Sequence, residues 1–120
     1  MKKSIILFEL LITIILFSIL SIYSLNFSLK LFIQNQKNFQ QNIQKIDLEN
    51  LKIFIQRKLI NNEFSLQDLS LDKSNLYYEN SLLQDDISLF DITQNNGLFT
   101  INVCIKKSDQ MCSKWILNEN

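Results

Sequence analysis

The sequence IILFELLITIILFSILSIYSLNFSLKLFI, from Ile5 to Ile33, decides the fold of this chain. Residues 5–25 are almost all apolar, and a helix of about 21 residues crosses roughly 30 Å, the hydrocarbon thickness of a bilayer. Lys2 and Lys3 come before this segment, and the positive-inside rule places such a flank in the cytoplasm. The sequence therefore predicts a single-pass inner-membrane protein whose remaining residues lie outside the membrane, in the periplasm of a Gram-negative cell.

Glu9 interrupts the apolar segment, and no opposite charge stands beside it in the sequence. A carboxylate near the middle of a membrane helix costs about 2.5–3.5 kcal/mol on insertion scales, and less near a helix end. Two explanations are open. The side chain can reach the headgroups at the cytoplasmic end of the helix, or it can meet a positive group that another chain supplies.

Lys2, Lys3 and Ser4 followed by IILFELLITIILFSIL resemble the N-terminal processing and methylation segment of type IV pilins and type II secretion pseudopilins. That family has a short basic leader, here residues 1–4, and a Glu as the fifth residue after the cleavage point. Cleavage between Ser4 and Ile5 makes Glu9 that fifth residue. The chain departs from the family pattern at two positions, since Ser4 stands where Gly is usual and Ile5 where Phe is usual.

The resemblance implies a minor pilin or pseudopilin, a structural subunit of a pilus or secretion filament. Its partners would be prepilin peptidase, the inner membrane and other pilin-like subunits. Cleavage would leave a free or methylated amine on Ile5, and Glu9 of one subunit would pair with that amine on its neighbour. The resemblance also implies a pilin-like α+β fold, in which a long N-terminal helix packs on a small antiparallel β-meander.

Two other interpretations compete with a filament subunit. The chain could be a single-span anchor that presents a periplasmic binding domain and never polymerises. It could also be a secreted protein with a cleaved signal peptide. Against the signal peptide stand Glu9, the length of the apolar run and the lack of a clear A-x-A cleavage site.

Composition argues against catalysis. The 120 residues carry no net charge and contain no His, the commonest general base and metal ligand. The sequence has no Ser-His-Asp set and no phosphate-binding loop, and nothing in it indicates nucleic-acid binding. Asp85, Asp86 and Asp91 match no calcium-binding loop and are typical turn residues. We therefore expect no enzyme, cofactor, metal site or small-molecule substrate.

The helix is expected to continue into water over residues 26–62, because no Pro or Gly interrupts it, and to stop near Asn61 and Asn62. At 100° per residue its apolar side chains form two stripes. One contains Phe39, Ile43, Ile46, Ile53, Phe54 and Ile60, and the other contains Leu48, Leu51, Ile55 and Leu59. We expect one stripe to cover the chain's own sheet, and the other to pack on the following loop or on neighbouring subunits.

Residues 63–120 are expected to form a connector and an antiparallel sheet. The connector, residues 63–74, reads as irregular with a helical turn, and a short hairpin follows around Asn80 and Ser81. A second hairpin turns at Asn96 and Gly97, because both residues accept positive φ. That turn pairs Ile92 with Ile101 and Phe90 with Val103, which places all four apolar side chains on one face.

Cys104 and Cys112 are the only cysteines. If they lie opposite each other in the last hairpin, Ile101 faces Trp115, Phe99 faces Leu117 and Ile105 faces Met111, on the same apolar face. Two facing thiols in an oxidising compartment are expected to form a disulfide. The alternative is two separate buried cysteines. Pilins often carry a disulfide near the C-terminus, so the resemblance agrees with the pairing.

Overall fold

The computed structural model describes residues 2–118 and contains one long helix and two small sheets. The helix α1 (Lys2–Ile60) runs through two compact units, which divide between Asn38 and Phe39. The elements after it are η1 (Leu66–Asp68), β1 (Leu69–Asp72), β2 (Asn75–Tyr78), β3 (Ser81–Gln84), β4 (Ile87–Asn95), β5 (Leu98–Lys106) and β6 (Gln110–Asn118). The fold class predicted from the sequence, α+β, is confirmed.

The helix ends where the sequence predicts. Asn62 adopts a left-handed conformation with φ of 55°, which an Asn accepts more readily than most residues. Its N–H donates to the carbonyl of Leu59 at 3.1 Å, and the N–H of Glu63 donates to the carbonyl of Lys58 at 3.0 Å. This pair of bonds is a Schellman motif, which satisfies two carbonyls at the helix end. Arg57 and Lys58 in the last turn add positive charge where the helix dipole favours it.

The strands form two three-stranded antiparallel sheets, β1-β2-β3 and β4-β5-β6, rather than the single meander expected. The break falls at Asp85 and Asp86, between β3 and β4. Asp86 has φ of 55°, and its carbonyl accepts the N–H of Lys106 at 2.9 Å. The chain therefore turns at Asp86 and bonds to the end of β5.

The connector contains more regular structure than the sequence indicated. The helical turn is present as η1, but β1 follows it and pairs with β2, with Leu69 opposite Tyr78 and Leu71 opposite Leu76. The first sheet therefore begins at Leu69. The turn between β2 and β3 is formed by Glu79 and Asn80, both with positive φ, rather than by Asn80 and Ser81.

The two hairpins of the second sheet have the registers that the sequence predicts. Asn96 and Gly97, with φ of 50° and 77°, form the turn between β4 and β5. Ile92 lies opposite Ile101 and Phe90 opposite Val103. In the next hairpin Cys104 lies opposite Cys112, and the three apolar pairs predicted with it, Ile101–Trp115, Phe99–Leu117 and Ile105–Met111, are all present.

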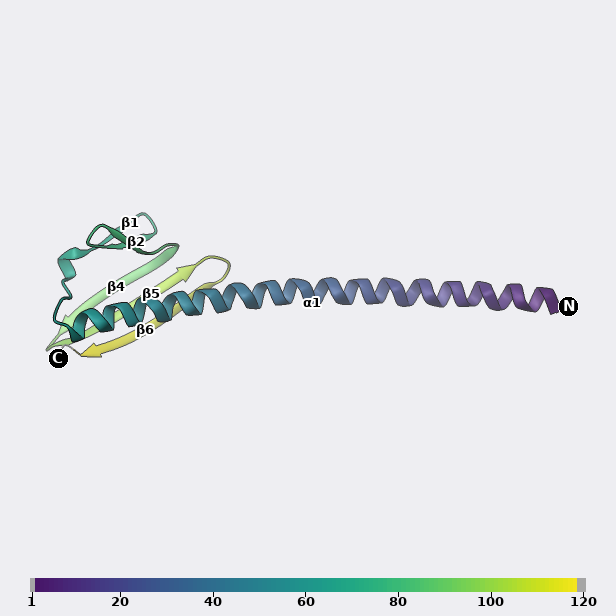
Figure 1. Cartoon of the computed structure of the whole chain (residues 1–120), viewed down its shortest axis with the longest axis horizontal. Coiled ribbons are helices and arrows are strands. Elements are labelled where there is room, and N and C mark those ends of the chain that lie inside the picture. The colour runs from purple at the N-terminus through teal and green to yellow at the C-terminus, as the bar shows by residue number, and fades with distance from the viewer. Residues whose placement is uncertain (1, 119–120) are drawn as a thin grey trace. The chain divides into compact units, whose positions relative to one another are not determined.

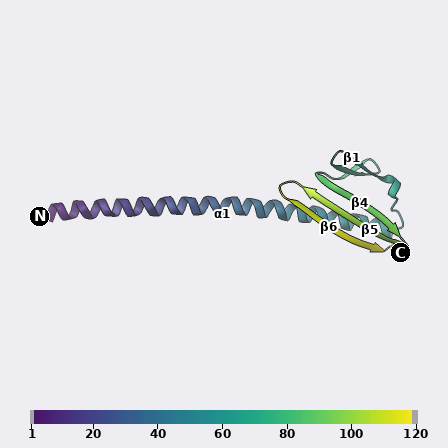
Figure 2. The same ribbon diagram turned by 180° about the vertical axis from the view of Figure 1, so that it is seen from behind.

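The core lies between the second unit's part of α1 and the sheets (Figures 1 and 2). From α1, the stripe of Leu48, Leu51, Ile55 and Leu59 is buried, so this is the stripe that faces the sheet. The sheet residues in the same cluster are Leu76, Ile87, Phe99, Ile101, Val103, Ile105, Trp115 and Leu117. Phe54, placed on the other stripe by sequence, is half-buried here, because its ring contacts Tyr78 edge-on at 5.5 Å.

Candidate functional site

The first unit of the chain presents apolar side chains to its surroundings. Among the described residues, α1 is the one helix long and apolar enough to cross a membrane, judged by length and composition. Its large apolar side chains from Ile5 to Leu25 are exposed throughout. In water this surface would be very unfavourable, whereas lipid tails solvate it fully.

Glu9 lies in the third turn of α1 and is exposed among these apolar side chains. Two hydroxyls of the same segment form hydrogen bonds within the helix. Thr13 Oγ1 donates to the carbonyl of Glu9, and Ser18 Oγ donates to the carbonyl of Ile14, both at 2.8 Å. Such bonds suit a helix in lipid, where no water can bind a free hydroxyl. Within residues 2–118, no basic side chain forms an ion pair with the Glu9 carboxylate.

Ser4 and Ile5 lie within the first turns of α1, which begins at Lys2. The leader predicted as residues 1–4 is thus helical from Lys2 onward. Both residues are exposed.

A second apolar surface lies on the second unit's part of α1, on the face away from the sheet. It consists of Phe39, Ile46, Ile53 and Ile60, which are 61%, 58%, 49% and 54% exposed. We call these four residues the outer stripe. They are spaced seven apart, so they follow one line along the helix, as the apolar positions of a coiled coil do. Ile43, which the sequence pattern predicts on the same stripe, is half-buried.

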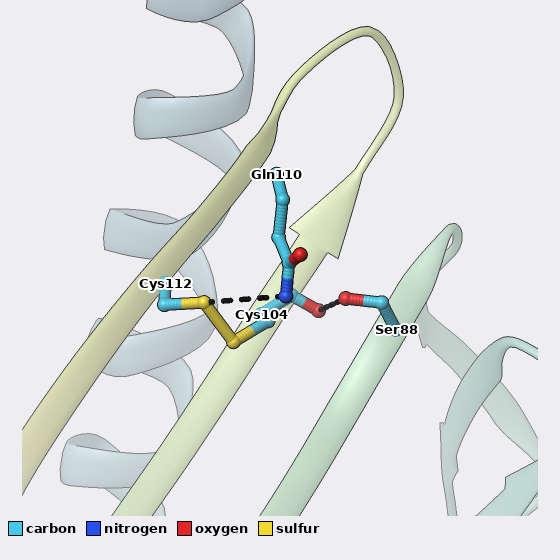
Figure 3. Close-up of a disulfide and its surroundings, with 4 residues drawn as sticks. All are labelled: Ser88, Cys104, Gln110 and Cys112. Carbon is cyan, nitrogen blue, oxygen red and sulfur yellow. Dashed lines mark hydrogen bonds between the residues drawn. A yellow bond between two sulfur atoms is a disulfide. The ribbon is translucent and has the colours of Figure 1, made fainter.

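Cys104 and Cys112 form a disulfide between β5 and β6 (Figure 3). Cys104 is buried, and Cys112 is exposed on the outer face of the sheet. The Nε2 of Gln110 donates to the Cys112 sulfur at 3.7 Å, and the Ser88 hydroxyl on β4 donates to the Cys104 carbonyl at 3.3 Å. Closing this short loop stabilises the fold by about 2–3 kcal/mol on the chain-entropy model.

Two lysines connect the helix to later segments of the chain. Lys107 Nζ lies 3.2 Å from Asp47 on α1 and 3.2 Å from Asp85. Burial lowers the pKa of Lys107, but hydrogen bonds to these two carboxylates outweigh burial and raise it above its ordinary value of 10.5. Lys58 donates to Glu63 at 3.1 Å, which raises the pKa of Lys58, and it also lies over the Tyr78 ring.

Sequence reasoning missed Gln44, which extends the buried face of α1 toward its N-terminus and is fully buried. Its Nε2 donates to the carbonyl of Asp109 in the turn between β5 and β6, at 3.2 Å, while its Oε1 has no hydrogen-bond partner among the described residues. The only signal in the sequence was position, because Gln44 lies four residues before Leu48 on the same helix face.

The three aspartates Asp85, Asp86 and Asp91 lie in different surroundings. Asp85 pairs with Lys107, the carbonyl of Asp86 bonds to Lys106, and Asp91 is exposed on β4. Among residues 2–118, no group of three or more His, Cys, Asp or Glu is placed to hold a metal ion.

The arrangement defines a class of protein: an α+β chain with an apolar helix that can cross a membrane and a small disulfide-bonded domain built on the same helix. Comparison with protein-family models, with curated proteins and with solved structures finds no match.

Proposed function

We propose that this chain is a minor pilin or pseudopilin, a structural subunit of a type IV pilus-like or type II secretion filament, assembled through α1. Its role is mechanical rather than catalytic: the helix holds the subunit in the membrane and in the filament, and a separate cytoplasmic ATPase drives assembly. The periplasmic domain supplies contacts at the filament surface or tip.

Glu9 is the observation that carries this proposal. A charged carboxylate surrounded by exposed apolar side chains is costly in a bilayer unless a positive group neutralises it. Cleavage between Ser4 and Ile5 by prepilin peptidase provides such a group, since the new amine of Ile5 is positive, with or without methylation. Pairing Glu9 with that amine on a neighbouring subunit offsets the burial of both charges and fixes the axial offset between subunits.

The outer stripe supports the same proposal from the aqueous part of the helix. A helix that is apolar on two faces is normally covered on both. The chain's own sheets cover one face and leave Phe39, Ile46, Ile53 and Ile60 exposed. Neighbouring helices in a filament would cover these side chains.

The membrane orientation in the proposal follows from charge and redox chemistry. Lys2 and Lys3 favour a cytoplasmic N-terminus. The disulfide between Cys104 and Cys112 is stable in an oxidising compartment such as the periplasm and rare in the cytoplasm. Both features favour a domain on the far side of the inner membrane.

Replacing Glu9 with Ala tests the proposal. We expect Glu9→Ala to leave the protein in the membrane fraction, because the helix becomes more apolar, and to reduce cross-linked multimers at least about tenfold, as the loss of a buried charge pair implies. Glu79→Ala is the matched control, since Glu79 is an exposed carboxylate in the turn between β2 and β3. Multimers are measured by amine-reactive cross-linking of intact cells and immunoblotting.

Equal multimer yields from Glu9→Ala and the unaltered chain would reject this role for Glu9. A complete lack of multimers in the unaltered chain, with the protein stable in the membrane, would favour the alternative: a single-span anchor that presents a periplasmic binding domain and does not polymerise.

A further inference from the structure

The last strand, β6, forms an open edge of the second sheet. It pairs with β5 along its whole length, and among the described residues no other strand pairs with it. An open edge presents unpaired backbone N–H and C=O groups, which another extended chain can bind.

The register shows which backbone groups face that edge. The Cα atoms of Cys104 and Cys112 are 4.0 Å apart, the close spacing of a non-hydrogen-bonded antiparallel pair. The direction of the Cys104 carbonyl supports this assignment. It accepts a hydrogen bond from the Ser88 hydroxyl on β4 and therefore points away from β6 (Figure 3). Backbone direction alternates along a strand, so Cys112, Lys114 and Ile116 direct their N–H and C=O groups to the open edge.

A groove of about 400 Å³ runs between this edge and α1. Its lining residues come from the two elements: Lys45, Leu48, Glu49 and Lys52 from α1, and Met111, Cys112, Ser113 and Trp115 from β6. The groove thus combines apolar side chains with two lysines and one glutamate, so its net charge is positive.

We propose that an extended segment of another protein, with alternating apolar and acidic side chains, binds in this groove as a fourth strand beside β6. Its backbone would bond to Cys112, Lys114 and Ile116. Side chains alternate between the two faces of a strand, so its apolar side chains would face α1 and contact Leu48 and Trp115, whereas its acidic side chains would lie on the outer face of the sheet beside Lys114. This site does not depend on membrane assembly through Glu9.

A second copy of the chain is a poor occupant. Lys114 is the central residue of β6 (Gln110–Asn118), so a symmetric antiparallel pair of β6 strands would place Lys114 opposite the same residue of the other copy. Like charges directly opposite each other destabilise a strand pair.

The test uses the full chain in detergent micelles and a synthetic peptide as long as β6, in which Val alternates with Glu. Trp115 is the only Trp and lines the groove, so its fluorescence reports binding. We expect a saturable change with this peptide, together with slower hydrogen exchange at Cys112, Lys114 and Ile116. A matched peptide with Lys in place of Glu should bind at least about fivefold more weakly, because the attraction to Lys114 is replaced by repulsion.

Two pairs of variants locate the site. Lys114→Pro removes an edge-facing N–H that β5 does not use, a position where Pro is tolerated in an edge strand, and it should weaken binding at least about tenfold. Lys114→Ala keeps the N–H and should weaken binding no more than about fivefold. Lys114→Glu should weaken binding of the acidic peptide more than Lys114→Ala does, whereas Lys73→Glu, in the exposed turn between β1 and β2, should leave binding unchanged.

Three results would overturn the proposal. The first is no saturable response to the acidic peptide while thermal unfolding shows a folded domain. The second is equal binding of both peptides, and the third is binding unaffected by Lys114→Pro. Dimerisation of the chain that Lys114→Pro abolishes would assign the edge to a second copy instead.

Discussion

At the scale of single residues, Lys107 connects three parts of the second unit. It lies in the turn after β5 and contacts Asp47 on α1 and Asp85 between β3 and β4. Its side chain is 26% exposed, as is that of Asp47, so solvent screens this pair less than a fully exposed one. Lys107 therefore helps to hold the sheet to the helix.

Lys107→Met should lower the free energy of unfolding by up to about 1 kcal/mol near neutral pH, because it removes a partly exposed ion pair. The folded-state pKa of Lys107 is raised above 10.5. Its contribution is therefore complete below pH 10.5 and is lost as the pH rises through the folded-state pKa. Urea unfolding of both proteins at a series of pH values measures the difference. Lys106→Met is the control, and a difference that grows above pH 10.5 would contradict this account.

At the scale of elements, the two faces of α1 have different roles. The face with Ile55 is covered by the sheets, whereas the outer stripe with Ile53 is exposed within the monomer. The two residues are close in sequence and identical in type, which makes them a matched pair for mutation.

Ile55→Ala should destabilise the domain by about 2–5 kcal/mol, since Ile55 is fully buried and truncation leaves a cavity. Ile53→Ala should change stability by no more than about 0.5 kcal/mol, because Ile53 is 49% exposed. Thermal unfolding followed by circular dichroism measures both. Similar losses from the two variants would mean that the helix faces are assigned wrongly.

The sequence predicted the hairpin registers because two independent constraints agreed. The Asn96–Gly97 turn fixed β4 against β5, and the two cysteines fixed β5 against β6, with one apolar face in both cases. The sequence did not reveal β1, because the leucines from Leu66 to Leu71 fit neither period clearly. The division into two sheets depends on the left-handed conformation of Asp86, which an Asp permits but does not require.

The helix faces and the candidate site were predictable only in part. Phe54 directly precedes the buried Ile55, so the two residues are separated by a rotation of about 100° around the helix axis. At that angle the large ring of Phe54 still reaches the core and packs on Tyr78. The sequence pattern did not predict the burial of Gln44, because a buried helix face is recognised by its apolar residues and Gln44 is polar. Glu9 stood out in the sequence as a costly charge, but its proposed partner belongs to another molecule, which one chain cannot reveal.

At the scale of the whole molecule, the proposed filament requires both apolar surfaces of α1. In that filament, residues 5–25 would lie in lipid, and the outer stripe would contact neighbouring helices. Neither surface is needed to fold the second unit, whose core uses the other face of α1. Folding and assembly should therefore be separable by mutation.

Ile53→Glu should leave the domain folded and the protein in the membrane while reducing multimers in cells, because it places a charge in a surface that neighbouring subunits would bury. Cross-linking yields measure the effect. The control is Gln56→Glu, which adds the same charge elsewhere on the exposed surface of the helix. Undiminished multimers would remove the outer stripe from the assembly surface.

The central claim is that Glu9 of one subunit contacts the amino terminus of another. A membrane-permeable carbodiimide joins a carboxylate to an amine only when the two are in contact, and mass spectrometry of the digested product identifies the joined peptides. We predict a link between Glu9 and an amino terminus that begins at Ile5. A chain that still begins at Met1, with no peptide linked to Glu9, would contradict the account.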